Sequence, residues 1–67
     1  MDIRLRVGRN LKKYRREAGF SQEGLALECD IHRTYVSGVE RGIRNPTVEV
    51  LEKLAKPLGV PAWKLLE

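Results

Sequence analysis

The sequence has very few of the residues that build metal centres, disulfide frameworks and catalytic sites. It contains one cysteine and one histidine, so neither an internal disulfide nor a four-ligand zinc site can form within one chain. A nucleophile–base pair with an orienting group, paired carboxylates and a glycine-rich phosphate loop are also missing. We therefore expect a protein without enzymatic activity, cofactor or bound metal.

Long apolar segments are missing as well. No run approaches the roughly 18 residues that a membrane-spanning helix needs, and the sequence shows no signal peptide. Together with the single cysteine, this favours the reducing cytoplasm. The 67 residues predict one small domain, residues 1–67, whose core is marginal because so short a chain buries only about 60% of its unfolded surface. Tight helix packing or a second copy of the chain must add stability.

Acidic residues are scarce in the first part of the chain. Residues 1–20 carry seven bases against Asp2 and Glu17, a sum of +5, while the whole chain has a net charge of +4. This asymmetry indicates a polyanionic partner, nucleic acid ahead of an anionic membrane surface. The apolar stripe in this part of the chain is needed for the core, which argues against membrane insertion.

The spacing of apolar residues predicts five short helices and no strand. Ser21 and Thr47 are good N-caps for the second and fourth of them, and Pro61 suits the first position of the fifth. Pro57 should end or kink the fourth helix near Lys56, because proline has no N–H to donate. The predicted helices are residues 2–18, 22–28, 32–42, 48–56 and 61–66. Residues expected to face the core in the first, second and fourth are Ile3, Val7, Leu11, Tyr14, Ala18, Leu25, Ala26, Cys29, Val48, Leu51, Leu54, Ala55 and Leu58.

The third predicted helix has two different faces when its residues are placed at 100° intervals. The apolar face can pack on a core, whereas the polar face offers a guanidinium, hydroxyls and, beside Gly38, a gap. In a DNA major groove, arginine pairs with guanine and a threonine methyl can meet a thymine methyl. The alternative is a simple solvated face. The apolar face consists of Tyr35, Val36 and Val39, and the polar face of Arg33, Thr34, Ser37 and Arg41.

Four short motifs then combine over residues 7–66, with a tight turn around Asp30 joining the second and third helices. The motifs are Ser21-Gln22-Glu23-x-Leu25-Ala26, Val36-Ser37-x-x-Glu40-Arg41-Gly42, Arg44-Asn45-Pro46-Thr47 and Leu51-x-x-Leu54-Ala55-x-x-Leu58-Gly59-Val60. With these motifs the chain resembles the phage-repressor-like (Cro/C1, XRE) helix-turn-helix family. Within that family it looks most like the controller proteins of restriction–modification systems.

The resemblance implies an all-α, compact five-helix lambda-repressor-like domain with the helix-turn-helix at helices 2 and 3. It implies a transcriptional regulator that binds a near-palindromic operator in double-stranded DNA as a homodimer, with two third helices about 34 Å apart. Such a regulator works in the cytoplasm, at the nucleoid when bound to DNA, and RNA polymerase is a further candidate partner. An antitoxin or adaptor that mainly binds a partner protein, with Leu27 and Trp63 as candidate contact residues, is the alternative.

Matched motif positions imply roles for single residues. Base contacts fall to Arg33, Thr34 and Ser37, and DNA-backbone contacts to Gln22, Tyr35, Arg44 and Asn45. Arg15 and Glu40 match a structural ion pair between the first and third helices. Tyr35 also lies near the apolar face, and a phenol can serve both roles with its ring packed and its hydroxyl outward.

The chain departs from the family pattern at several positions. His32 stands where a serine, threonine or aspartate cap is usual, so the third helix has a poorer cap. Asp30 replaces the usual turn glycine, which an aspartate can do by adopting left-handed geometry. Gly38 replaces a polar residue that reads bases in many members, so that contact is either missing or made by the backbone.

Trp63 is a fourth departure, since the fifth helix is often polar at this position. An exposed tryptophan on so small a domain favours an interface. We expect the dimer face on the fifth helix and the end of the fourth. The competing interpretation is that Trp63 completes the core of the monomer. The residues expected at the dimer face are Leu58, Val60, Trp63 and Leu66.

Overall fold

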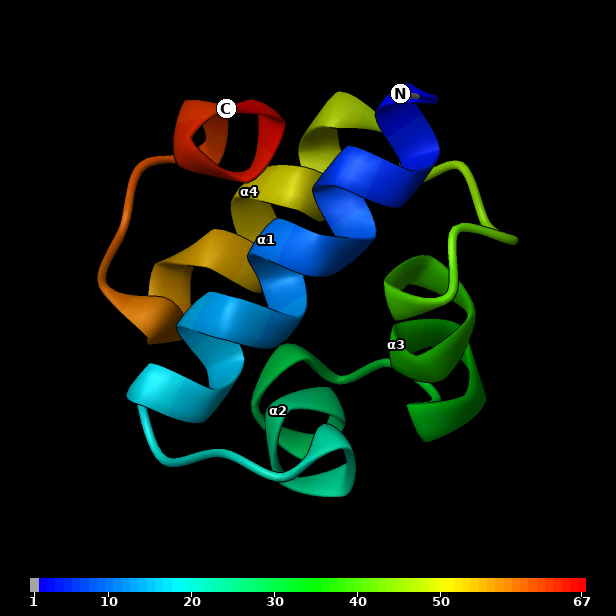
Figure 1. Ribbon diagram of the computed structural model, residues 1–67. Helices are drawn as coiled ribbons and strands as arrows, with labels where there is room; N and C mark the ends of the chain where they lie inside the picture. Colours follow the sequence, from blue (N-terminus) through cyan, green and yellow to red (C-terminus); the bar gives the residue numbers. More distant parts are fainter. Residues whose placement is uncertain (1) are drawn as a thin grey trace.

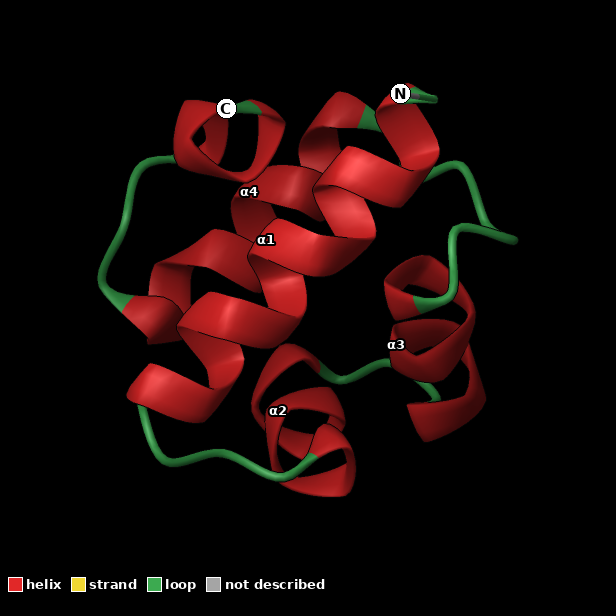
Figure 2. Cartoon of the chain, in the orientation of Figure 1, coloured by secondary structure: helices red, strands yellow, loops and turns green. Residues whose placement is uncertain are grey.

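The computed structural model describes residues 2–67, which form helices and loops with no strand (Figures 1 and 2). Helix α1 packs on α3 and η1, α2 packs on α3 and α4, and α4 packs on η1. This arrangement places α2 and α3 together on one side of the domain (Figure 1). The elements are α1 (Ile3–Glu17), α2 (Gln22–Cys29), α3 (Arg33–Glu40), α4 (Val48–Leu58) and the 3₁₀ turn η1 (Ala62–Leu66).

All five elements contribute buried side chains to one core. The predicted inner faces of α2 and α3 are confirmed, as are most positions on α1 and α4. Ile3, Ala18 and Val48, however, are exposed. They lie at or just beyond helix ends, where no further element of this chain covers them. The buried apolar residues are Val7, Leu11, Leu25, Ala26, Cys29, Val36, Val39, Leu51, Leu54, Ala55 and Leu65.

Side chains cap three of the four α-helices at their N-termini. The predicted caps are confirmed: Ser21 Oγ accepts a hydrogen bond from Gly24 N at 2.9 Å, and Thr47 Oγ1 accepts one from Val50 N at 3.2 Å. The third cap is Asp2, before α1. At α3 the N-cap His32 makes no such bond, as expected. Each cap satisfies an N–H group that the helix itself leaves without an acceptor.

Helix α4 does not end at Lys56, so the prediction that Pro57 ends the helix there was wrong; the alternative of a kink at this point stays a prediction. The helix runs through Pro57 to Leu58, and Gly59 ends it in the left-handed region at φ 72°. Proline at this position cannot donate to the carbonyl of Lys53, four residues earlier. The thiol of Cys29 on α2 donates to that carbonyl instead, with Sγ 3.3 Å from the oxygen. Burial raises the pKa of the Cys29 thiol, which keeps the donor proton in place.

The fifth helix is a 3₁₀ turn, and Pro61 occupies its N-cap rather than its first helical position. Lys64 N donates to Pro61 O at 3.0 Å, the i→i+3 bond of a 3₁₀ turn. Asn10 Nδ2 on α1 donates to Leu65 O at 3.0 Å, which fixes the turn against the domain. The predicted five helices are therefore four α-helices and this turn. No helix among residues 2–67 is long and apolar enough to cross a membrane.

Candidate nucleic-acid interface

The turn between α2 and α3 sets the direction in which α3 presents its polar face. Asp30 adopts left-handed geometry at φ 54°, and Ile31 N donates back to Ala26 O at 3.0 Å. The chain thus reverses within a few residues, and α3 begins at Arg33. The prediction that Asp30 takes the conformation usual for a turn glycine is confirmed.

Helix α3 is held by its apolar face, and its polar face points outward. Val36 and Val39 are completely buried. On the opposite side Arg33 and Thr34 are exposed, and Ser37 is half-buried. The three side chains expected to contact bases therefore lie on the surface that α3 presents to solvent.

A buried ion pair anchors the C-terminal end of α3 to α1. The expected pair between Arg15 and Glu40 is present, with Nε 2.6 Å from Oε2 and Nη2 3.1 Å from Oε1. The side chain of Arg15 is 9% exposed and that of Glu40 is 3% exposed. Arg15 Nη1 also donates to Phe20 O at 2.8 Å. The guanidinium therefore has carboxylate and carbonyl acceptors, as a buried charge requires.

Gln22 belongs to the same network. Its Nε2 donates to Glu40 Oε1 at 2.9 Å, which joins the first residue of α2 to the last residue of α3. Sequence reasoning assigned Gln22 to a phosphate and missed this contact, because only the fold brings the two residues together. The network of Arg15, Gln22 and Glu40 links α1, α2 and α3.

Gly8 allows α1 to lie close to the end of α3. A Cβ at this position would lie 2.5 Å from the carbonyl oxygens of Val39 and Glu40, a distance that requires the backbone to move. This role of Gly8 could not be found from the sequence, because it depends on a contact between residues more than thirty positions apart in the chain. Any larger residue at position 8 would push the end of α3 away from α1 and so disturb the ion pair between Arg15 and Glu40.

The expected gap beside Gly38 is filled. Gly38 is buried, and a Cβ there would lie 2.6 Å from Cγ of Arg44. The carbonyl of Gly38 accepts hydrogen bonds from Ile43 N at 2.9 Å and Arg44 N at 3.2 Å. The interpretation of an open position on this face was therefore wrong, because the side chain of Arg44 crosses it.

Arg44 also lies over Tyr35, with its guanidinium carbon 5.7 Å from the ring centroid. Tyr35 is half-buried and its ring packs against the core. This agrees with the prediction that the ring is packed while the hydroxyl is left for a second role. Arg44 and Asn45 are both exposed in the loop after α3. The four residues expected to contact the DNA backbone, Gln22, Tyr35, Arg44 and Asn45, thus lie around the polar face of α3.

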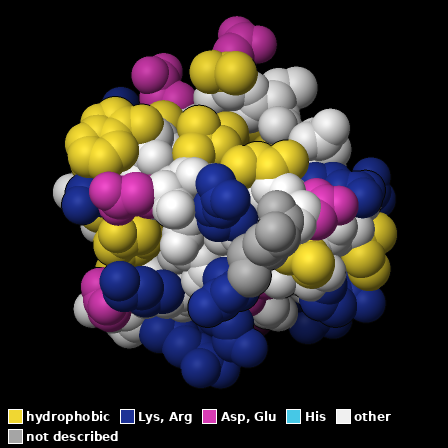
Figure 3. Space-filling view, turned by 45° about the horizontal axis from the view of Figure 1, so that its top comes forward, with side chains coloured by type: hydrophobic (Ala, Val, Ile, Leu, Met, Phe, Trp, Pro, Cys, Tyr) yellow, Lys and Arg dark blue, Asp and Glu magenta, His cyan; other side chains and the backbone are white. Residues whose placement is uncertain are grey.

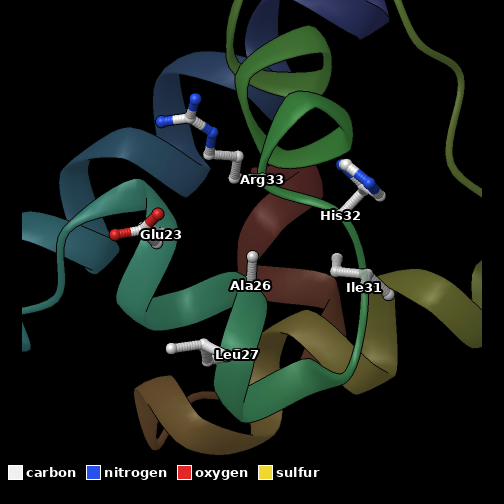
Figure 4. Close-up of a pocket in the computed structure, with 6 residues that line it drawn as sticks. All are labelled: Glu23, Ala26, Leu27, Ile31, His32 and Arg33. Carbon is white, nitrogen blue, oxygen red and sulfur yellow. The ribbon is translucent and has the colours of Figure 1, made fainter.

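His32 and Thr34 contact each other at the start of α3. Thr34 Oγ1 lies 3.4 Å from His32 Nδ1, and both residues are exposed. Arg33 points to the other side of the helix start from His32 (Figure 4). This contact was not predicted from the sequence, where His32 stands out only as a poor cap.

The apolar residues expected to form a dimer face lie on a different part of the surface. Trp63 is 58% exposed and Leu66 is 42% exposed, so the interpretation that Trp63 completes the monomer core was wrong; Leu65 takes that place. A groove between α4 and η1 is lined by Val60, Trp63 and Leu66, and by Val48, but not by Leu58. Figure 3, turned to bring this end of the domain forward, shows apolar side chains mainly in its upper part and Lys and Arg side chains gathered at the bottom.

Comparison with known proteins agrees with this geometry. The helix-turn-helix family model HTH_3 matches residues 11–62. The chain belongs to this helix-turn-helix family. Control protein C.BamHI of Bacillus amyloliquefaciens is 46% identical over 67 residues, which cover 98% of this chain and 83% of that protein. The resemblance to controller proteins is confirmed.

Two solved members of the family have the same fold. The hypothetical transcription factor NHTF from Neisseria superposes with a TM-score of 0.94 at 44% identity, covering 98% of this chain and 76% of that one. The restriction–modification controller protein C.AhdI from Aeromonas hydrophila superposes with a TM-score of 0.88 at 39% identity, covering 92% and 94%. These two proteins therefore share the fold of this helix-turn-helix protein over nearly its whole length.

Proposed function

We propose that this helix-turn-helix protein is a transcriptional regulator that binds a near-palindromic DNA operator as a homodimer and controls restriction–modification genes. The observation that carries the proposal is the outward polar face of α3, where Arg33 and Thr34 are exposed while Val36 and Val39 on the opposite face are completely buried. The helix-turn-helix unit is α2 with α3, within a lambda-repressor-like domain. The similarity to C.BamHI and C.AhdI supports the regulatory role.

Base recognition falls to three residues of α3. The guanidinium of Arg33 can donate two hydrogen bonds to O6 and N7 of a guanine, and the methyl and hydroxyl of Thr34 can meet a thymine methyl or a base-edge polar group. Ser37, one turn further along and half-buried, reaches a base edge only after close approach. Base contacts supply sequence selection, whereas phosphate contacts set position and orientation.

Backbone contacts fall to residues around that face. Arg44 and Asn45 in the loop reach phosphates on one side, and Gln22 at the start of α2 reaches one on the other, where helix N–H groups also favour an anion. The side-chain amide of Gln22 is hydrogen-bonded to Glu40, so this side chain is already oriented before it meets a phosphate. The Tyr35 hydroxyl is the fourth contact, with its ring fixed beneath Arg44.

The dimer forms through the apolar groove. Trp63 and Leu66 supply the exposed apolar surface, and the half-buried Val60 continues it. A two-fold interface uses the same patch on both subunits, so Trp63 of each subunit would lie near the groove of the other. Leu58 is half-buried against the core and does not line the groove, so it is left out of this proposed interface. Contact with RNA polymerase and association with the nucleoid follow from promoter binding.

Selection from a random pool of duplex DNA, followed by sequencing, tests this function. The expected result is a symmetric consensus whose half-sites are centred about one helical turn apart. Enrichment of no sequence, or of an asymmetric site bound by a monomer, would contradict the proposal. A protein that instead copurifies with an unrelated chain and loses it on substitution of the exposed Leu27 would support the adaptor alternative.

A further inference from the structure

Gly38 is a glycine inside α3 that no backbone conformation requires. Glycine is less favourable than alanine in the interior of a helix. Within residues 2–67 the glycines with a positive φ are Gly19, Gly42 and Gly59, whereas Gly38 lies in the regular part of the helix. The reason for a glycine at this position therefore lies in what occupies the space beside it.

The side chain of Arg44 fills that space. Leaving aside α3 itself, the three atoms nearest to a Cβ at position 38 would all belong to Arg44: Cγ at 2.6 Å, Nε at 3.6 Å and Cβ at 3.7 Å. Because Cγ belongs to the stem of the side chain and not to its far end, a Cβ so close would force the whole side chain to move. Glycine at position 38 thus lets Arg44 cross α3, and alanine would displace it.

Two further kinds of contact hold Arg44 in the same place. Gly38 O accepts hydrogen bonds from Ile43 N at 2.9 Å and Arg44 N at 3.2 Å, which fix the loop backbone against α3. At the other end of the side chain, the guanidinium carbon lies 5.7 Å from the ring centroid of Tyr35, a distance at which an arginine is attracted to an aromatic face. Tyr35 and Gly38 are three residues apart and are therefore neighbours on the helix surface.

The guanidinium held in this way still has its donors available. Arg44 is exposed, and no hydrogen bond or ion pair joins its side chain to another residue of the range 2–67. A guanidinium presents its N–H donors in a planar fork that suits a phosphate, and a side chain that is already ordered loses less entropy on binding. We propose that Gly38 and Tyr35 are positioning residues that hold Arg44 ready for a DNA phosphate, an inference that rests on the DNA-binding function proposed above.

The test is a double-mutant cycle on positions 38 and 44, measured as affinity for a random duplex by fluorescence anisotropy. Gly38→Ala in the wild type should weaken binding by about two- to tenfold, the scale of ordering one long side chain. In the Arg44→Ala background there is no stem to displace, so Gly38→Ala should leave the affinity unchanged. A loss of the same size in both backgrounds, or no loss in either, would overturn the proposal.

Urea denaturation of the same four proteins shows whether the two side chains compete for one space. In the Arg44→Ala background the nearest atom outside α3 is Cβ of residue 44, at 3.7 Å, so Gly38→Ala should raise the urea midpoint as alanine does in a helix. In the wild type the displaced Arg44 should reduce or reverse that gain. Equal changes in the two backgrounds would mean that position 38 does not act through Arg44.

Two variants of Tyr35 separate its ring from its hydroxyl. Tyr35→Phe keeps the ring, whereas Tyr35→Leu removes it. In NMR spectra of the free protein, the ring should shift the side-chain methylene protons of Arg44 in the wild type and in Tyr35→Phe. That shift should be lost in Tyr35→Leu and in Gly38→Ala. Methylene protons that respond to neither substitution would contradict the proposed positioning.

Failure of this inference and failure of the proposed function give different results. A wild-type protein that selects no sequence and binds no duplex contradicts the function. A protein that selects an operator, but in which the effects of positions 38 and 44 on affinity simply add, contradicts only the positioning of Arg44. Selection of an operator together with a non-additive cycle supports both.

Discussion

The polar face of α3 and the apolar groove beside η1 are both exposed, but they are built in opposite ways. Behind α3 the charged groups are buried and paired, and those on the surface are free to meet a ligand. At the groove the surface itself is apolar, with Trp63 58% exposed. A polar face is stable in water without its partner, whereas an apolar one is stabilised when covered. The first is therefore suited to reversible DNA binding and the second to a lasting contact between subunits.

The largest expected effect comes from breaking the buried pair behind α3. Glu40→Ala leaves the guanidinium of Arg15 without its carboxylate and should cost about 3–5 kcal/mol of unfolding free energy. The measurement is urea denaturation at fixed protein concentration. As a control, Glu67→Ala removes a carboxylate that lies 3.6 Å from Lys64 in an exposed pair and should cost less than about 1 kcal/mol. Equal costs for the two variants would mean that the buried network does not hold α3.

Next in size is the effect expected on the proposed dimer. Trp63→Ala removes a large exposed ring and should weaken dimerisation by about 2 kcal/mol or more, roughly 30-fold in dissociation constant. Analytical ultracentrifugation measures this, while circular dichroism should show a folded monomer. Leu27→Ala is the matched control, because Leu27 is 78% exposed but lies outside the groove. A Trp63→Ala protein that remains fully dimeric would place the interface elsewhere.

Substitution on the polar face should affect sequence selection. Arg33→Ala should cost about 1–3 kcal/mol on the selected operator and little on random DNA, because a bidentate contact to guanine is lost. Fluorescence anisotropy with both duplexes gives the two affinities. If they fell equally, Arg33 would be a phosphate contact and its assignment to a base would be wrong.

The smallest effect is expected for a backbone contact at the edge of that face. Arg44→Ala should weaken binding to the selected and the random duplex alike and reduce the salt slope by about one counterion. Titrations at several salt concentrations measure that slope. A loss restricted to the selected duplex would instead assign Arg44 to base recognition.

Local signals in the sequence predicted most of the architecture. The caps at Ser21 and Thr47 and the buried faces of α2 and α3 depend on neighbours within one or two turns, so spacing and residue type suffice. Ile3, Ala18 and Val48 were the exceptions, because periodicity cannot show where covering elements end.

Contacts between distant elements could not be predicted in the same way. Pro57 remains inside α4 because a thiol from α2 reaches the carbonyl that proline leaves free. The gap at Gly38 is closed by Arg44 from the following loop, and Gln22 bonds to Glu40 across two helices. Each depends on three-dimensional proximity. The polar face itself was found from sequence because a single helix carries it.

The most direct test of the account is amide chemical-shift mapping by NMR as the selected operator duplex is added to the wild-type protein. The account predicts that the largest shifts fall on Arg33, Thr34 and Ser37, with smaller ones at Gln22, Arg44 and Asn45. Shifts concentrated instead on the outer side of α1, with α3 unchanged, would contradict it.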